Sequence, residues 1–228
     1  ILELSTFDYL MSKSPTIQNE NILLVDLDEE IVKAYGGYPL PRSLFASMIE
    51  NTEGVSGLTL LMPDPDLRDN RNDYKLASAM SVKPTVLAYT ASTQATESGP
   101  HVGTAQLGEN PLPWLLNYQG ILRQLPVLQL NAGGVGLINS SPELDGVVRR
   151  MPVAVSSGDK IYPSFPLEML RLAVGDPSYQ IKTNETGVEW LRVPSYPTIT
   201  TDANARIWVQ QNVKFHRQTA SQYMQNPI

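Results

Sequence analysis

Acidic side chains that follow two short apolar runs are the first residues whose types and spacing could do chemistry. The runs are Ile22–Val25 and Gly57–Leu61, and both are typical of strands in a parallel sheet. Because the carboxyl ends of such strands meet at one edge, where ligands usually bind, we expect these carboxylates to lie together near a Pro-rich turn. An arginine of that turn could neutralise them or bind an anionic ligand group. The candidate ligand-binding residues are therefore Asp26, Asp28, Arg42, Asp64 and Asp66.

Two interpretations of this acidic group stay open. Carboxylate oxygens bind hard divalent cations and pair with amines, so the group could hold a cationic solute. The acidic residues after the second run are also interleaved with Arg68 and Arg71, which favours a solvated loop held by salt bridges. We favour the salt-bridged loop, and we assign no metal ligand from the sequence.

The sequence gives little support to an enzyme. Asp26 and Asp28 have the spacing found in haloacid-dehalogenase-type phosphatases, but position 30 is Glu and no Asp-Asp pair follows a later strand. His101 and His216 are the only histidines, and neither has a partner at metal-ligand or triad spacing. The chain has no cysteine, which excludes thiol nucleophiles and disulfides. We therefore predict no catalytic residue, no cofactor and no enzymatic activity for this chain.

Composition narrows the class of protein further. The 228 residues carry 17 basic and 23 acidic side chains, and the net charge of −6 disfavours a nucleic-acid surface. No apolar run reaches the roughly 18–20 residues that a membrane span requires. We expect one domain over residues 1–228. The sequence opens on Ile1-Leu2-Glu3-Leu4 without Met or a signal peptide, as expected for a segment of a longer protein.

The first half of the chain alternates predicted strands and helices. A helix opened by Pro41 follows the strand at 22–25, and a second helix separates the strand at 57–61 from one at 85–89. Two crossovers of this length imply a right-handed βαβαβ unit. The predicted fold class is α/β, with a mainly parallel βαβαβ core sheet, helices on both faces, and antiparallel strands added by the C-terminal half.

The second half is less regular. Residues 91–131 have no clear period and are predicted to form an irregular excursion. A strand pair at 136–139 and 147–155 follows, and then a helix that Ser164 begins and Gly175 ends. Short strands are predicted at 188–193, 196–201 and 206–209, the last two joined by a turn.

Two arginines lie side by side in the strand predicted at 147–155. Consecutive side chains of a strand point to opposite faces, so Arg149 and Arg150 cannot share one environment. We expect one of them to be buried and paired with a carboxylate or carbonyl, and the other to be exposed.

Several collinear segments carry a resemblance to a known family. The most specific runs from Gly136-Leu137-Ile138-Asn139 through Asp145-Gly146-Val147-Val148-Arg149-Arg150-Met151-Pro152, and is followed by Tyr162-Pro163-Ser164-Phe165. The others are Leu4–Asp8, Ile22–Glu30, Gly37–Arg42, Gly57–Pro63 and Thr201–Ile207. Together they resemble the type 2 CHASE domain, an extracytoplasmic sensory domain associated with cyclases and histidine kinases. The residues that carry its structural motif are Pro41, Asp145, Gly146, Arg149, Arg150 and Pro163.

This resemblance implies a sensor module outside the inner or plasma membrane of a bacterial receptor, flanked by transmembrane helices that lie outside this chain. Residues 1–14 would form a membrane-proximal helix, and Ile1 and Ile228 should reach the same membrane-facing side. A cytoplasmic nucleotide cyclase or kinase would receive the signal. The implied partner is an unidentified small molecule or protein, and a homodimer stays open.

Two functions from different classes therefore remain. One is a sensor that binds a small solute, which a formed, partly polar pocket at the strand ends would favour. The other is a scaffold for protein–protein contact without a small ligand, which a broad exposed apolar patch would favour.

Overall fold

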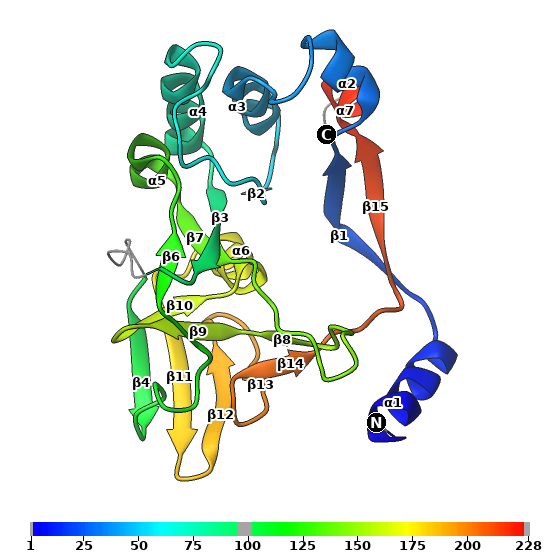
Figure 1. The fold of residues 1–228 in the computed structure, drawn as a ribbon, viewed down its shortest axis with the longest axis vertical. Coiled ribbons are helices and arrows are strands. Elements are labelled where there is room, and N and C mark those ends of the chain that lie inside the picture. Colours follow the sequence, from blue (N-terminus) through cyan, green and yellow to red (C-terminus); the bar gives the residue numbers. More distant parts are fainter. Residues whose placement is uncertain (1, 95–101, 226–228) are drawn as a thin grey trace.

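The computed structural model describes residues 2–94 and 102–225, and it is a mixed α/β structure, as the sequence predicts (Figure 1). Its strands form several small sheets that contain both parallel and antiparallel pairs. Two separate clusters of buried apolar side chains stabilise it.

The central sheet is built around β3 (Thr85–Ser92), whose first five residues are buried. β3 pairs in parallel with β2 (Ser56–Leu58) and β7 (Gly134–Leu137), and antiparallel with β6 (Gly120–Leu122). A continuous apolar run suits this position because both faces of the strand are covered.

Four helices contribute to the core around this sheet. α4 (Arg71–Val82) contacts both α3 (Arg42–Glu50) and α5 (Pro126–Asn131), whereas α6 (Phe165–Val174) packs on β3 and β7. The bounds of α6 confirm the predicted helix. Ser164 is its N-cap residue, and Gly175 ends it with φ of 72°, a conformation that favours glycine.

The C-terminal half adds short strands in three further sheets. The largest contains β4 (Thr104–Gly108), β11 (Tyr179–Asn184), β12 (Gly187–Arg192) and β13 (Ile199–Thr200), of which β4 and β11 are parallel. The others are β5 (Asn117–Tyr118) with β9 (Ala154–Ser157) and β10 (Lys160–Pro163), and β8 (Arg150–Pro152) with β14 (Arg206–Trp208).

A two-stranded ribbon stands apart from these sheets, on the right of Figure 1. β1 (Ile17–Asp26) pairs in parallel with β15 (Val213–Thr219). α1 (Leu2–Lys13) lies at one end of the ribbon, and α2 (Glu29–Ala34) and α7 (Ala220–Gln225) lie at the other (Figure 1).

The ribbon corrects the predicted sheet order. The strand at 22–25 was expected beside the strand at 57–61, but it belongs to β1 and pairs with β15 instead. An apolar run indicates a strand without indicating its neighbour. β15 is rich in charged and polar residues, so it lacks the apolar pattern that would indicate a strand.

Other expectations are also corrected. The region 91–131 is not irregular throughout, because its described part contains β4, β5, β6 and α5. β7 and β8 do not pair with each other, since β7 joins β3 and β8 joins β14. β13 and β14 likewise lie in different sheets, so the last two predicted strands do not pair with each other across their turn.

The two ends of the described chain lie far apart. α1 and α7 occupy opposite ends of the ribbon (Figure 1), so these helices do not meet the expectation of a shared side. Ile1 and Ile228, on which that expectation was placed, lie outside the described residues.

Candidate functional site

The Pro39–Arg42 turn and the loop after β2 form one hydrogen-bonded unit around Arg42. Pro41 is the N-cap residue of α3, and Arg42 begins the helix as a buried residue. The guanidinium group of Arg42 pairs with buried Asp73 and donates to the carbonyl oxygen of Asp64. Because both charges of the Arg42–Asp73 pair are buried, each depends on the other.

Asp66 is the main acceptor of this unit. Its carboxylate accepts hydrogen bonds from the backbone N–H of Arg42, Arg68 and Asp69, and from the side-chain amide of Asn72. Burial opposes ionisation of Asp66, but these hydrogen bonds outweigh it and hold the pKa of Asp66 below its ordinary value. The groups that the sequence suggested for a ligand thus hold the loop together.

Arg68 joins the same loop to the turn before α3. Its guanidinium group donates to the carbonyl oxygens of Tyr35, Gly37 and Pro39. The two joined segments present the largely exposed side chains of Tyr38 and Leu67.

Asp26 and Asp28 lie in the ribbon. Asp28 accepts hydrogen bonds from Ser221 Oγ at 2.6 Å and from Ser221 N at 3.2 Å, which connects the end of β1 to α7. The Ser221 hydroxyl bond lowers the pKa of Asp28 from its ordinary value. Asp26 Oδ2 lies 3.7 Å from Arg217 Nε.

The prediction that four carboxylates meet at one sheet edge is therefore wrong. Asp26 and Asp28 contact β15 and α7, whereas Asp64 and Asp66 contact the starts of α3 and α4. The two pairs of acids are separate because β1 belongs to the ribbon and not to the sheet of β2, so the two strands do not end at one sheet edge. Among the residues that the structure describes, no group of three or more His, Asp or Glu is placed to hold a metal ion.

Arg149 forms the most extensive ion-pair site of the predicted motif. It is 2% exposed. Its Nε and Nη2 donate to the two carboxylate oxygens of Asp8 at 2.7 Å, and its Nη1 and Nη2 donate to those of Asp145 at 2.9 and 2.7 Å. Asp8 lies in α1 and Asp145 in the loop before β8. One side chain thus connects α1 to the body of the domain.

A tight turn positions Asp145 for this contact. Gly146 has φ of 83°, a conformation that favours glycine, and its N–H donates to Glu143 O at 2.9 Å. Val147 N donates to Asp145 Oδ1 at 3.1 Å. The Arg149 guanidinium lowers the pKa of Asp145 to about 2 and also lowers the pKa of Asp8, so both acids stay ionised.

Arg150 builds a second contact beside the first. Its Nε and Nη2 donate to Glu143 at 2.7 and 2.8 Å, and its Nη1 donates to Asp202 at 3.4 Å. Its guanidinium lies 5.1 Å from the ring centroid of Trp208, which in turn lies 4.2 Å from that of Phe7 in α1. One arginine is therefore buried and paired, as expected, but the prediction that the other is exposed is wrong because acids and a ring cover it.

Pro163, another residue of the predicted motif, has a structural role at the end of a strand. It is the buried last residue of β10 and pairs with Ala154 of β9. The next residue, Ser164, donates its N–H to Val153 O at 2.8 Å, so the chain enters α6 at a fixed position.

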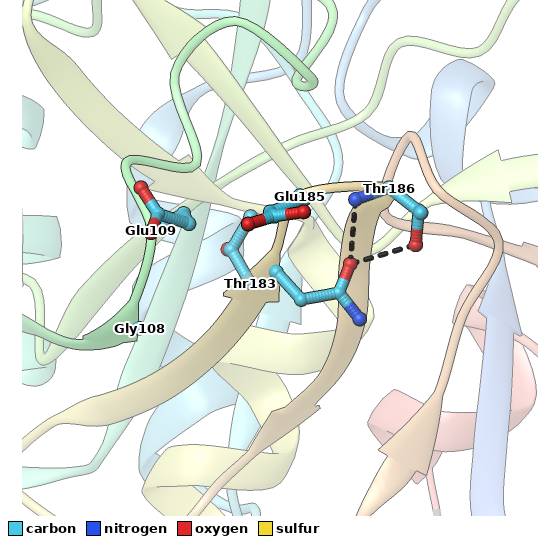
Figure 2. A pocket seen from close by; sticks show the side chains of 6 residues that line it. Gly108, Glu109, Thr183, Glu185 and Thr186 are labelled. Atoms are coloured by element: carbon cyan, nitrogen blue, oxygen red, sulfur yellow. Dashed lines mark hydrogen bonds between the residues drawn. The ribbon is translucent and has the colours of Figure 1, made fainter.

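A surface hollow of about 500 Å³ lies at the carboxyl ends of the parallel strands β4 and β11 (Figure 2). Asn184 fixes its turn, since Asn184 Oδ1 accepts hydrogen bonds from Thr186 N and Oγ1 at 2.7 Å. Glu109 and Glu185 line the hollow, so it suits cations or hydrogen-bond donors and disfavours anions. It is lined by Gly108, Glu109, Thr183, Asn184, Glu185 and Thr186.

Sequence reasoning did not assign the partners that complete these arginine sites. The partners of Arg149 and Arg150 include Asp8, Glu143 and Asp202, and that of Arg42 is Asp73. Asp8, Asp73 and Asp202 are distant in sequence from the arginines that they pair with, so spacing cannot identify them. Asp145 and Glu143 are nearer, since they lie four residues before Arg149 and seven residues before Arg150.

The comparison with protein families covers almost the whole chain. The family model for the CHASE2 domain matches residues 1–226, a range that includes α1, the Asp145–Gly146 turn and both arginines. This chain belongs to the CHASE2 domain family. The comparison found no match among curated proteins and none among solved structures.

Membership of the family places this CHASE2 domain among extracytoplasmic sensory modules. Within the described ranges, none of its helices has both the length and the apolar character needed to cross a membrane. The Arg149 site is the part of this CHASE2 domain where the segments 143–150 and 2–13 meet.

Proposed function

We propose that this CHASE2 domain is the sensory part of a transmembrane receptor and that its signal passes through Arg149 to α1. The observation that supports this is the difference in burial between Arg149 and the helix that it holds. Arg149 is almost fully buried, whereas α1 presents mostly exposed side chains, including Tyr9 and Leu10. Among the contacts that the structure describes between α1 and the body, the Asp8–Arg149 pair is a charged contact with two hydrogen bonds.

Such an attachment can have two discrete states, with α1 docked or released. A stimulus that moves the turn at 143–147 would displace Asp145 and change how Arg149 holds Asp8. α1 would then act as the membrane-proximal helix of the receptor, and a cytoplasmic cyclase or kinase would read its state. The stimulus is a small solute or a protein that binds the body of the domain.

The test compares two arginines that each pair with an acid, in otherwise identical chains. Arg149→Met removes both bonds to Asp8, whereas Arg206→Met removes the ion pair of a half-buried arginine with Asp202, outside α1. We expect amide hydrogen exchange in residues 2–13 to rise about tenfold in the first variant and to change little in the second. Equal exchange in the two variants would exclude the proposed coupling.

A protein–protein scaffold is the second candidate, and the exposed pair Tyr38 and Leu67 favours it. Arg68 holds both segments, so their apolar side chains are presented on a fixed surface, as interface residues are. The double substitution Tyr38→Ser and Leu67→Ser should leave folding intact. A loss of output in a receptor that carries this domain, with α1 exchange unchanged, would favour the scaffold over the Arg149 route.

A further inference from the structure

The β1–β15 ribbon has two unlike faces. Val25 packs against the main hydrophobic cluster, so its face of the ribbon is turned toward the body. Side chains alternate along a strand, and register partners share a face, so Leu24 and its partner Arg217 point the other way. We name this second side the outer ribbon face. It includes Leu24, Asp26, Phe215 and Arg217. Ile17 belongs to it as well, because its partner Val213 alternates with Phe215 and Arg217 along β15, and the register of β1 shifts between Asn19 and Leu23.

The outer ribbon face exposes both apolar and charged side chains to solvent. Ile17 is 44% and Phe215 is 36% exposed. A two-stranded ribbon is marginally stable on its own, and parallel strands are normally covered on both faces. The outer ribbon face thus has the character of a surface that another chain covers.

We propose that a second copy of this chain packs on the outer ribbon face about a two-fold axis parallel to the strands. Such an axis, placed between two facing ribbons, sets β1 of each copy opposite β15 of the other. Ile17 and Phe215 would then be covered by the apolar residues of the second copy. The proposal does not depend on the coupling through Arg149.

Charge favours a second copy as the occupant. β1 contributes Asp26 to this face and β15 contributes Arg217, so the two-fold axis brings each acid of one copy to the base of the other. Within one chain, Arg217 Nε and Asp26 Oδ2 are 3.7 Å apart, with exposed fractions of 65% and 56%. That distance exceeds the roughly 2.7–2.9 Å of a charge-assisted hydrogen bond, so both groups can take a further partner. Complementarity at symmetric positions is what a two-fold interface requires.

A mixing experiment distinguishes this interface from an internal role of the same pair. Asp26→Arg gives a chain with two bases on the outer ribbon face, and Arg217→Asp gives a chain with two acids. In sedimentation equilibrium, we expect wild type to dimerise, each variant alone to dimerise at least about tenfold more weakly, and their mixture to form a heterodimer. Wild type that stays monomeric up to about 1 mM, or a mixture no stronger than its components, overturns the proposal.

Cross-linking tests the same face without changing its charges. The chain has no cysteine, so one introduced thiol is unique in each copy. A short bismaleimide should link two copies of Ile17→Cys, whereas Gln18→Cys, the exposed neighbour on the other face, should give little product. Equal yields from both positions, or a higher yield from Gln18→Cys, would contradict the proposed face even if the charge variants failed to fold.

Discussion

Arg149 and Asp8, which are 141 residues apart, are joined by two parallel hydrogen bonds of 2.7 Å each. This fork geometry is specific to the planar guanidinium group of arginine. Arg149 uses its remaining N–H groups for Asp145, so one buried cation balances two acids from different segments. The pair therefore combines charge with orientation, and it fixes the angle at which α1 meets the body.

Lysine should not replace Arg149. Arg149→Lys keeps the positive charge, but a single ammonium group cannot make two-bond contacts with Asp8 and Asp145 together. We expect the domain to remain folded while hydrogen exchange in α1 rises about tenfold. Arg217→Lys is the control, since Arg217 is exposed and its pairing is long. Wild-type protection of α1 in Arg149→Lys would show that charge alone is sufficient.

Acid should release α1. The pKa of Asp145 is lowered from 3.8 to about 2, and the pKa of Asp8 is also lowered, because Arg149 donates hydrogen bonds to both. A carboxyl whose folded pKa is depressed stabilises the docked state above its ordinary pKa, and this contribution disappears as pH falls through the folded value. Trp208, which contacts Phe7, should therefore change its fluorescence between about pH 4 and pH 2.

The control for this pH effect is Phe7→Leu. It removes the ring contact but keeps the ion pair, so the fluorescence change should shrink while acid still increases hydrogen exchange in α1. Protection of α1 that persists unchanged at pH 2 would contradict the assignment.

Local features of the fold could be predicted from the sequence because their causes are local. The apolar run of β3 and the capped helix from Ser164 to Gly175 are examples, since burial and capping leave a pattern in adjacent residues. The neighbour of β1 could not be predicted, because Ile22–Val25 would suit any covered strand and β15 carries little apolar signal.

The same limit applies to the candidate site. Asp145 and Arg149 are four residues apart and lie in one recognisable motif, so their importance was visible in the sequence. Asp8, the other acid that pairs with Arg149, could not be identified from the sequence, because only the folded chain brings α1 to the turn. Asp26 and Asp28 do not meet Asp64 and Asp66 for a related reason, because that expectation depended on β1 lying beside β2.

Gly134 should not tolerate alanine. A Cβ at this position would overlap the carboxylate of Glu168, which is fully buried and receives two hydrogen bonds of 2.8 Å from Arg171. Burial raises the pKa of Glu168, so displacing this side chain from its partner is costly. We expect Gly134→Ala to lower the free energy of unfolding by about 1–3 kcal/mol in denaturant titrations. Gly103→Ala, where an added Cβ meets no atom within 4 Å in the part of the chain that the structure describes, should have little effect.

Glu168 itself should be more sensitive than Gly134. Glu168→Ala leaves buried Arg171 without its acid, and removing one member of a buried pair costs about 3–5 kcal/mol. A denaturation midpoint equal to that of wild type would show that the Arg171 contacts to the carbonyl oxygens of Gly133 and Asp176 suffice.

Gln124 should be the most important neutral side chain at the end of the central sheet. It is buried, its Nε2 donates to Leu60 O at 2.9 Å and Ala88 O at 2.5 Å, and its Oε1 accepts from Met62 N at 2.6 Å. Gln124→Leu leaves three backbone groups unpaired, and each unpaired buried group costs about 1–3 kcal/mol. We therefore expect the free energy of unfolding to fall by at least about 3 kcal/mol. For a chain of this length, that loss lowers the melting temperature by about 6–12 °C. The matched control is Gln129→Leu in α5, because Gln129 Oε1 is buried and has no hydrogen-bond partner among the described residues, so its removal should cost little. Equal melting temperatures for the two variants would show that water replaces the Gln124 amide and that β2 and β3 are held by their own backbone pairing alone.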